Sequence, residues 1–155
     1  MVHPMSDETY MEMAFEEASM AASREEVPVG ALLVSADGKV LAREGNRILE
    51  KKDPTAHAEI LAIRAAAARL GNERLIGTTL YVTLEPCTMC AGAISFARVA
   101  RLVYGAPDEK GGAVDHGAEF FKGPTCHHRP EVDAGLMAEE SAELLRGFFR
   151  ARRKS

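Results

Sequence analysis

The sequence predicts an α/β fold, a three-layer α/β/α sandwich around a central mixed sheet. Short apolar runs of strand length alternate along the chain with longer amphipathic or alanine-rich segments of helical length. A sheet whose strands alternate with helices is covered by helices on both faces. The 155 residues are enough for one domain with its own core. We therefore expect a single domain over residues 1–155, with residues 1–5 either disordered or an extension.

The N-terminal half predicts a helix, a hairpin and a second helix. Apolar side chains recur among acids over residues 9–22, which is typical of an amphipathic helix. Residues 29–34 form a strand-like apolar run, and a turn at Asp37-Gly38 leads to a second strand over 40–42. Residues 56–70 are rich in alanine and leucine and are followed by glycine, a typical helix stop.

The C-terminal half continues the alternation. Residues 80–84 predict a buried strand, and Pro86 is expected to open a helix, since proline is tolerated in the first helical turn. A further strand follows over 101–104, then a Gly-, Pro- and His-rich loop with a short insert over 105–130, and a last amphipathic helix over 138–153. We expect the sheet to be antiparallel in the first hairpin and at least partly parallel after it.

The charge is unevenly distributed along the chain. The net charge of −4 argues against salt-driven nucleic-acid binding over the whole surface. Residues 1–26 hold seven acids and one base, whereas the last ten residues hold five bases and no acid. A basic helix end can simply be solvated and favoured by the helix dipole. Phe148 and Phe149, however, lie inside this basic cluster. Basic side chains together with aromatic rings are typical of proteins that bind single-stranded nucleic acid.

Composition also bears on location. The longest apolar runs, such as 29–34, are too short to span a bilayer, so we expect no membrane segment. The N-terminus lacks the basic and apolar regions of a secretory signal. Of the three cysteines, two form a C-x-x-C pair, which suits metal binding in a reducing compartment. We therefore expect a cytoplasmic protein.

Two short segments of the chain together predict a catalytic zinc centre. His57-Ala58-Glu59 is followed by Pro86-Cys87-x-x-Cys90, which offers one imidazole, two thiols and one carboxylate. Cysteines three apart share a helix face, so Cys87 and Cys90 can bind one ion together with His57. Three protein ligands leave the fourth tetrahedral position open to water, as in catalytic rather than structural zinc sites. Glu59 is then left to move protons.

A closed structural zinc site is the alternative interpretation. Its fourth ligand would come from Cys126, His127 or His128 in the long loop. In such a closed site Glu59 would have no catalytic role. We instead expect Cys126 to be a small buried thiol and the two histidines to be loop or surface features.

An open zinc site with a nearby carboxylate predicts hydrolytic deamination of a nucleobase. Zinc lowers the pKa of bound water to about 7, so that hydroxide is available at neutral pH. Glu59 is placed to accept that proton and to deliver it to the base and the leaving amine. The His-x-Glu and Pro-Cys-x-x-Cys segments are together the signature of zinc-dependent base deaminases.

The chain resembles the bacterial tRNA-specific adenosine deaminases, within the wider cytidine and deoxycytidylate deaminase superfamily. The zinc segments specify only the superfamily, and the narrower likeness rests on the Pro54-Thr55-Ala56 lead-in and the Phe-Phe-Arg-x-Arg-Arg end. The segments that carry the resemblance are residues 26–31, 45–47, 53–60, 80–93, 104–108 and 148–153. It implies a cytidine deaminase-like fold, one zinc ion per subunit, and conversion of the wobble adenosine of a tRNA anticodon loop to inosine.

The resemblance also implies roles for particular residues. Asn46 would hold the flipped base, Asp108 would contact the target nucleotide or its neighbour, and Phe149, Arg150 and Arg153 would grip the anticodon loop. Asn46 and Asp108 also fit a simpler interpretation as turn residues. The loop over 109–130 has no role that the resemblance specifies.

Two other functions are compatible with parts of the sequence. A deaminase of a free base or nucleoside, such as guanine or cytosine, would share the fold but needs no basic aromatic helix end. A non-catalytic RNA-binding module would retain zinc but would have no use for Glu59. The resemblance further implies a homodimer. Residues 89–97 are apolar nearly all round, so that helix must be covered on more than one side.

Overall fold

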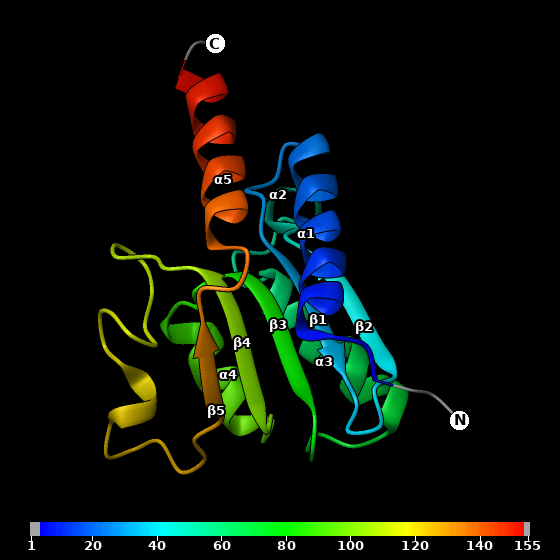
Figure 1. Ribbon diagram of the computed structural model, residues 1–155. Helices are drawn as coiled ribbons and strands as arrows, with labels where there is room; N and C mark the ends of the chain where they lie inside the picture. The colour runs from blue at the N-terminus through cyan, green and yellow to red at the C-terminus, as the bar shows by residue number, and fades with distance from the viewer. Residues whose placement is uncertain (1–3, 154–155) are drawn as a thin grey trace.

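The computed structural model describes residues 4–153 and forms three layers (Figure 1). Lys154 of the basic cluster and the first three residues lie outside this range. In chain order the elements are α1 (Asp7–Ser23), β1 (Gly30–Val34), β2 (Val40–Gly45), α2 (Ile48–Lys51), α3 (Ala58–Leu70), β3 (Thr79–Leu84), α4 (Thr88–Phe96), β4 (Arg101–Ala106), the 3-10 turn η1 (Phe120–Lys122), β5 (Glu131–Ala134) and α5 (Ala138–Arg153).

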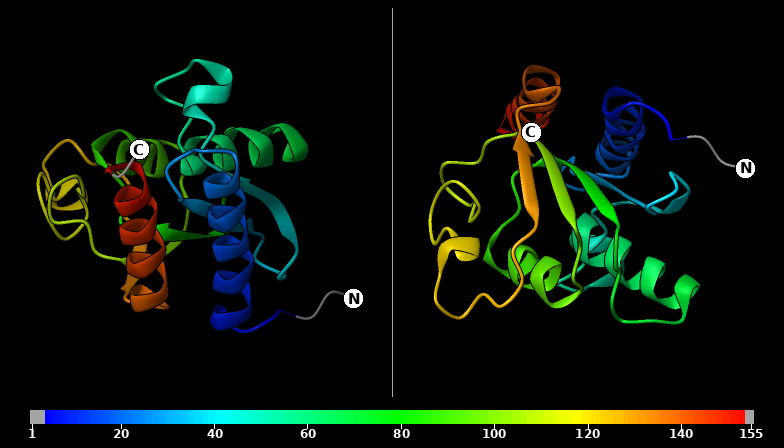
Figure 2. Two further views of the ribbon diagram at one scale, coloured as in Figure 1. Left: turned by 90° about the horizontal axis from the view of Figure 1, so that it is seen from above. Right: turned by 60° about the horizontal axis from the view of Figure 1, so that its bottom comes forward.

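The five strands form one mixed sheet in the order β2-β1-β3-β4-β5. Strand β1 pairs antiparallel with both β2 and β3, whereas β3–β4 and β4–β5 are parallel. Helices α1 and α5 lie on one face of the sheet, and α3 and α4 cover the other (Figure 2). The predicted α/β/α sandwich and the mixed sheet are confirmed.

The core has one part on each face of the sheet. Successive side chains of a strand point to opposite faces, so Leu32 packs toward α1 while Leu33 joins the larger cluster under α3 and α4. Gly30 lets α1 approach β1 closely, because a Cβ atom there would lie 1.9 Å from the carbonyl oxygen of Ala14. Strands buried on both faces explain why β1 and β3 read as continuous apolar runs.

Two elements were not predicted. Strand β5 is a sheet edge whose only sizeable apolar residue, Val132, is half-buried, so it lacks the apolar run that marks an internal strand. Helix α2 is a single turn that ends at Lys52 in the left-handed conformation. The 105–130 loop does contain its short insert, η1, although β4 extends to Ala106.

Two helix starts also differ from the prediction. Helix α4 begins at Thr88 with Cys87 as its N-cap, so Pro86 precedes the helix instead of opening it. Helix α3 begins at Ala58 with His57 as its N-cap, two residues later than expected. The predicted glycine stop is confirmed, since Gly71 caps α3 in the left-handed conformation.

The N-terminal segment lies against the domain. The backbone nitrogen of Met5 donates to the Tyr10 hydroxyl at 3.0 Å. Asp7, at the start of α1, forms an ion pair with Arg101 on β4 at 2.8 Å. Within residues 4–153, no helix has the length and apolar character needed to cross a membrane.

Candidate active site

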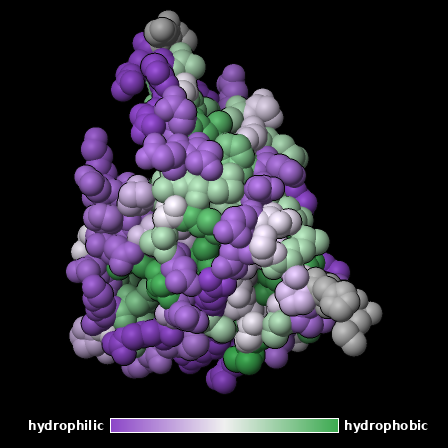
Figure 3. Space-filling model, in the orientation of Figure 1, coloured by the Kyte–Doolittle hydropathy of each residue, from purple (hydrophilic) through white to green (hydrophobic). Residues whose placement is uncertain are grey.

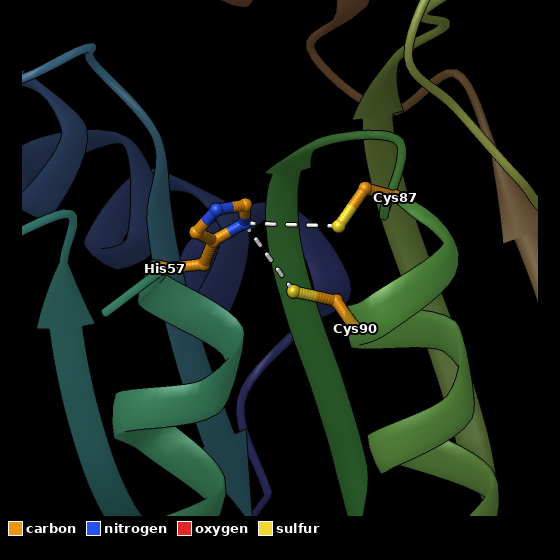
Figure 4. A group of neighbouring side chains, drawn as sticks. All are labelled: His57, Cys87 and Cys90. Atoms are coloured by element: carbon orange, nitrogen blue, oxygen red, sulfur yellow. Dashed lines mark hydrogen bonds between the residues drawn. The ribbon is translucent and has the colours of Figure 1, made fainter. Parts of the chain in front are cut away.

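The predicted zinc ligands come together where α3 and α4 begin. His57 and Cys87 are the N-cap residues of the two helices, and Cys90 lies in the first turn of α4. The sequence placed His57 and Cys87 inside the first turns. The N-cap position is more favourable, because its extended backbone lets each side chain turn toward the other helix. Figure 4 shows the imidazole pointing from α3 toward both thiols.

The geometry of the three side chains fits zinc. Nδ1 of His57 lies 3.7 Å from Sγ of Cys87 and 3.6 Å from Sγ of Cys90. In a tetrahedral site with ordinary Zn–N and Zn–S bond lengths, an imidazole nitrogen and a thiolate sulfur are about 3.6 Å apart. Within residues 4–153, this is the one cluster of at least three His, Cys, Asp or Glu side chains that could hold a metal ion. Nδ1 is the ring nitrogen of His57 that faces both thiols.

The electrostatics of the cluster favour a bound cation. A hydrogen bond from Cys90 and the nearby His57 lower the pKa of Cys87 to about 4, although burial opposes them. The same thiolate raises the pKa of the Cys90 thiol and of the His57 imidazole. Metal ligands bind in their deprotonated forms, so a divalent cation would take the place of the Cys90 thiol proton and of any proton on Nδ1 of His57.

Glu59 is a buried carboxyl beside the ligands. It lies in the first turn of α3, and its residue is only 4% exposed. Burial raises its pKa to about 7, and the Cys87 thiolate adds to the rise while His57 opposes it. A carboxyl that titrates near neutral pH is suited to both accept and donate a proton.

His57, Cys87 and Glu59 line one cavity of about 250 Å³. Side chains from five separate segments line it, which is why no single stretch of sequence defines it. The lining residues are Val27, Val29, Asn46, Ile48, His57, Glu59, Leu84, Glu85, Cys87, Asp108 and Gly111.

Asn46 lines the cavity and also supports a ligand. Its side chain Oδ1 accepts the backbone N–H of Ala58 at 2.8 Å, which satisfies one of the free donors at the start of α3. Its backbone N–H donates to Val29 and its carbonyl accepts from Arg24. The residue is 5% exposed. Asn46 is therefore a buried part of the cavity wall. Its position after glycine had suggested only a turn residue.

Asp108 also lines the cavity. Its Oδ1 accepts the N–H groups of Lys110 at 3.2 Å and Gly111 at 2.9 Å, so the interpretation as a turn residue is correct as well. Its own N–H donates to Oε1 of Glu85 at 3.0 Å. Glu85 was not singled out in the sequence. The available signal was an acid placed directly between a buried apolar strand and Pro86, a position that requires it to have partners.

Helix α5 brings Phe149 to the mouth of the cavity. Phe149 is 45% exposed and lines a groove of about 650 Å³ whose wall includes Asp108 and Gly111. Phe148 is half-buried, packs edge-on against Phe149 at 5.4 Å, and carries Arg152 over its ring at 4.3 Å.

The basic residues lie next to this groove. Arg150 and Arg153 are exposed and line a hollow of about 690 Å³ with Lys110. Arg150 also pairs with Glu143 at 3.1 Å. Hydrophilic side chains gather over the last turns of α5, as Figure 3 shows. The described part of the predicted RNA-binding cluster therefore lies on one continuous surface with the cavity.

The three candidates for a fourth ligand lie apart from the cluster. Cys126 is buried, with Sγ 3.6 Å from the Ser95 hydroxyl and 3.1 Å from the carbonyl of His128. His127 is exposed, and Nε2 of His128 is 2.7 Å from the carbonyl of Val99. The predicted buried thiol is confirmed, and none of the three belongs to the metal cluster.

A zinc ion held by these three donors would keep one tetrahedral position for water, next to the buried carboxyl of Glu59. On this three-layer fold, that arrangement defines the class of zinc-dependent hydrolytic deaminases. Residues 4–106 match the family model described as the cytidine and deoxycytidylate deaminase zinc-binding region. The chain belongs to this family.

Two curated relatives point to a narrower group within this family. The chain is 62% identical over 144 residues to the tRNA-specific adenosine deaminase of Agrobacterium fabrum, covering 93% of this chain and 94% of that one. It is 47% identical over 148 residues to the enzyme of the same name from Haemophilus influenzae, covering 96% and 86%.

Solved structures agree in fold. A structure from a study of A-to-I editing by tRNA:A34 deaminases at the wobble position is 62% identical, with a TM-score of 0.87 over 88% of this chain and 99% of that chain. A guanine deaminase from Nitrosomonas europaea is 26% identical, with a TM-score of 0.76 over 95% and 86%. The same fold therefore serves both a polynucleotide substrate and a free base.

Proposed function

We propose that the protein converts the wobble adenosine of a tRNA anticodon loop to inosine by hydrolytic deamination. One observation carries the proposal. The cavity adjoins a groove that contains the exposed Phe149, and this groove adjoins a hollow lined by basic side chains. A free base would fill the cavity alone, whereas a nucleotide within a loop needs room for its neighbours. The curated relatives named tRNA-specific adenosine deaminase support the same substrate.

In this proposal His57, Cys87 and Cys90 hold one zinc ion per subunit. When bound, zinc supplies the Lewis acid that makes water nucleophilic at neutral pH. Glu59 would accept one proton of the attacking water and deliver it to a ring nitrogen. It would then take the second proton from the new hydroxyl on the ring carbon and give it to the amine, which departs as ammonia as the carbonyl forms. Its burial keeps this proton within the cavity.

The remaining residues would recognise the RNA. The Oδ1 of Asn46 is bonded to Ala58, so its amide nitrogen is the group left to donate to the flipped base. Asp108 would contact the target nucleotide or its neighbour. Phe149 would stack on a base, and Arg150 and Arg153 would contact phosphates. A loop base is already partly unstacked, so flipping it costs little.

We also propose a homodimer formed through α4. Phe96 is 79% exposed and Met89 37%, and both lie on the face of α4 away from the sheet, where a Cβ at Gly92 would meet open space. An exposed apolar stripe of this kind is covered well by a second copy around a two-fold axis. Light scattering at micromolar concentration tests the dimer, and a monomer would contradict it. A cytoplasmic location fits the free cysteines.

A substrate panel tests the function. Zinc-loaded protein is assayed with an anticodon stem-loop bearing a wobble adenosine, and in parallel with free guanine, cytosine and cytidine. We expect inosine in the stem-loop and little turnover of the free bases. Activity on guanine alone would favour the free-base deaminase, whose fold the Nitrosomonas europaea structure shares. Stem-loop binding without turnover would favour a non-catalytic RNA-binding module.

A further inference from the structure

Glu85 is a fully buried carboxylate that gathers hydrogen bonds from one loop. Its side chain is 0% exposed. Oε2 accepts the backbone N–H groups of Val114 at 3.1 Å, Asp115 at 2.9 Å and His116 at 3.2 Å. Oε1 accepts the N–H of Asp108 at 3.0 Å and lies 2.7 Å from Nδ1 of His116. Four backbone donors and one imidazole therefore converge on a single carboxylate.

All of these donors belong to the segment 108–116, which follows β4. The carboxylate binds both ends of this segment and so closes it into a loop. The loop carries Asp108 and Gly111, which form one wall of the catalytic cavity. Glu85 directly follows β3 and is tied to the end of β4, because its backbone N–H donates to the carbonyl of Ala106 at 2.9 Å. The Tyr104 hydroxyl on β4 also donates to Asp115, so Glu85 is one of the side chains that attach this cavity wall to the sheet.

Gly112 shows how closely the loop packs on the carboxylate. A Cβ atom at this position would lie 2.4 Å from Cδ of Glu85 and 2.5 Å from the carbonyl oxygen of Asp108. Any larger residue would push the loop away from Glu85. A buried charge is costly unless hydrogen bonds satisfy it, and here the loop supplies those bonds. Neither the zinc ligands nor the proton transfer requires this arrangement.

We propose that Glu85 is a positioning residue that holds the 108–116 loop against the cavity and thereby sets Asp108 in place for the substrate. The effect on substrate rests on the function proposed above, whereas the effect on the loop does not. Glu85 lies in the wall of the cavity, but its carboxylate is occupied by the loop. It acts on the substrate through Asp108.

Glu85→Gln separates the two ends of the loop. The amide oxygen can still accept the N–H groups of Val114, Asp115 and His116. The amide nitrogen can donate to a neutral His116 ring but cannot accept the N–H of Asp108. We therefore expect hydrogen exchange to speed up at the Asp108 amide, while the amide of Asp115 stays protected.

The kinetic consequence is a weaker grip on the stem-loop. With Glu85→Gln we expect KM for the anticodon stem-loop to rise about tenfold, the scale of removing one hydrogen bond to a charged group. We expect kcat to change less and zinc content to stay at the wild-type level. If Glu85 acts through Asp108, the double variant with Asp108→Ala should have the KM of Asp108→Ala alone.

Glu17→Gln is the matched control. Glu17 is also a buried carboxylate, but it pairs with Arg43 at 2.9 Å and lies on α1, away from the cavity. We expect this variant to lower the melting temperature and to leave KM unchanged. A purely structural role for Glu85 would give the same pattern as this control.

Two results would overturn the proposal. One is unchanged exchange at the Asp108 amide in Glu85→Gln, and the other is KM effects of Glu85→Gln and Asp108→Ala that simply add. If Glu85→Gln does not fold, Gly112→Ala disturbs the same packing from the loop side and must give the same exchange and KM changes. If the wild-type chain does not act on the stem-loop, the proposed function fails, and amide exchange alone decides the positioning role.

Discussion

Nδ1 of His57 lies 3.6 Å from Sγ of Cys90, although the two residues are 33 positions apart in the chain. That separation is the one expected, at about 3.6 Å, of two ligands on one tetrahedral zinc ion. The two side chains come this close because α3 and α4 pack side by side on the same face of the sheet and begin next to each other. The fold therefore places donors from two distant segments within the reach of one metal ion.

Glu59→Ala is expected to keep the fold and the zinc but to lose deamination. It removes the proton carrier without removing a ligand, and general acid–base catalysis by one group contributes about 10²–10⁴-fold. Single-turnover rates on the stem-loop, with zinc measured by elemental analysis, check this. Near-wild-type turnover or stoichiometric loss of zinc would contradict the assignment of Glu59.

Cys87→Ala and Cys90→Ala are each expected to lower zinc content and the melting temperature. Either change leaves a two-ligand site between the starts of α3 and α4, and metal binding contributes to folding stability. Cys126→Ala is the matched control, since this buried thiol lies outside the cluster and should leave zinc content unchanged. A full zinc equivalent in either ligand variant would show that the ligand set is wrong.

Asp7 should make stability depend on pH in the acid range. The hydrogen bond from Arg101 lowers the pKa of Asp7 below its ordinary value of 3.8, with Tyr81 adding to the effect and burial opposing it. A carboxylate with a lowered folded-state pKa stabilises the fold above its unfolded-state pKa and loses that contribution as pH falls through the folded-state value. Asp7→Asn should therefore differ from wild type in free energy of unfolding at neutral pH and converge with it as the pH falls through the folded-state pKa of Asp7.

Urea unfolding at a series of pH values measures this difference. Glu8→Gln is the control, because its exposed side chain is the next residue along α1. A constant gap between Asp7→Asn and wild type down to the lowest pH would mean that the ion pair with Arg101 is not its cause.

Phe148→Ala and Phe149→Ala are expected to act differently. Phe148 is half-buried and lies under Arg152, so its loss should lower the melting temperature. Phe149 is exposed in the groove that continues from the cavity, so its loss should raise KM for the stem-loop. Stacking of one base on an aromatic ring corresponds to about a five- to 150-fold change. Equal effects of the two variants on KM and stability would contradict this division.

Arg150→Ser with Arg153→Ser should weaken RNA binding and flatten its salt dependence. For a single strand, removing one cation that neutralises a phosphate reduces the slope of log K against log salt by about 0.7. Binding titrations of the stem-loop at several salt concentrations measure the slope, and zinc content should not change. An unchanged slope would mean that this helix end is only solvated, and the free-base substrate would then be the better hypothesis.

Local signals in the sequence were sufficient for most of the fold and for the zinc donors. The apolar run of β3 and the helix with its glycine stop at Gly71 can be read from a few consecutive residues. His57, Cys87 and Cys90 are recognisable because zinc demands particular donors at particular spacings. Edge strand β5 escaped prediction because an exposed edge needs no continuous apolar run.

Residue types and their spacing were enough to identify which side chains can bind metal, which carboxyl can carry a proton, and which helix end is basic and aromatic. Folding in three dimensions was needed to establish that the two zinc segments meet at N-cap positions, that Asn46 supports α3, and that Glu85 gathers the 108–116 loop. The sequence alone indicates the metal donors because donor chemistry is a property of each residue. A cavity wall and its hydrogen bonds depend instead on which distant backbone groups the sheet and helices bring within about 3 Å.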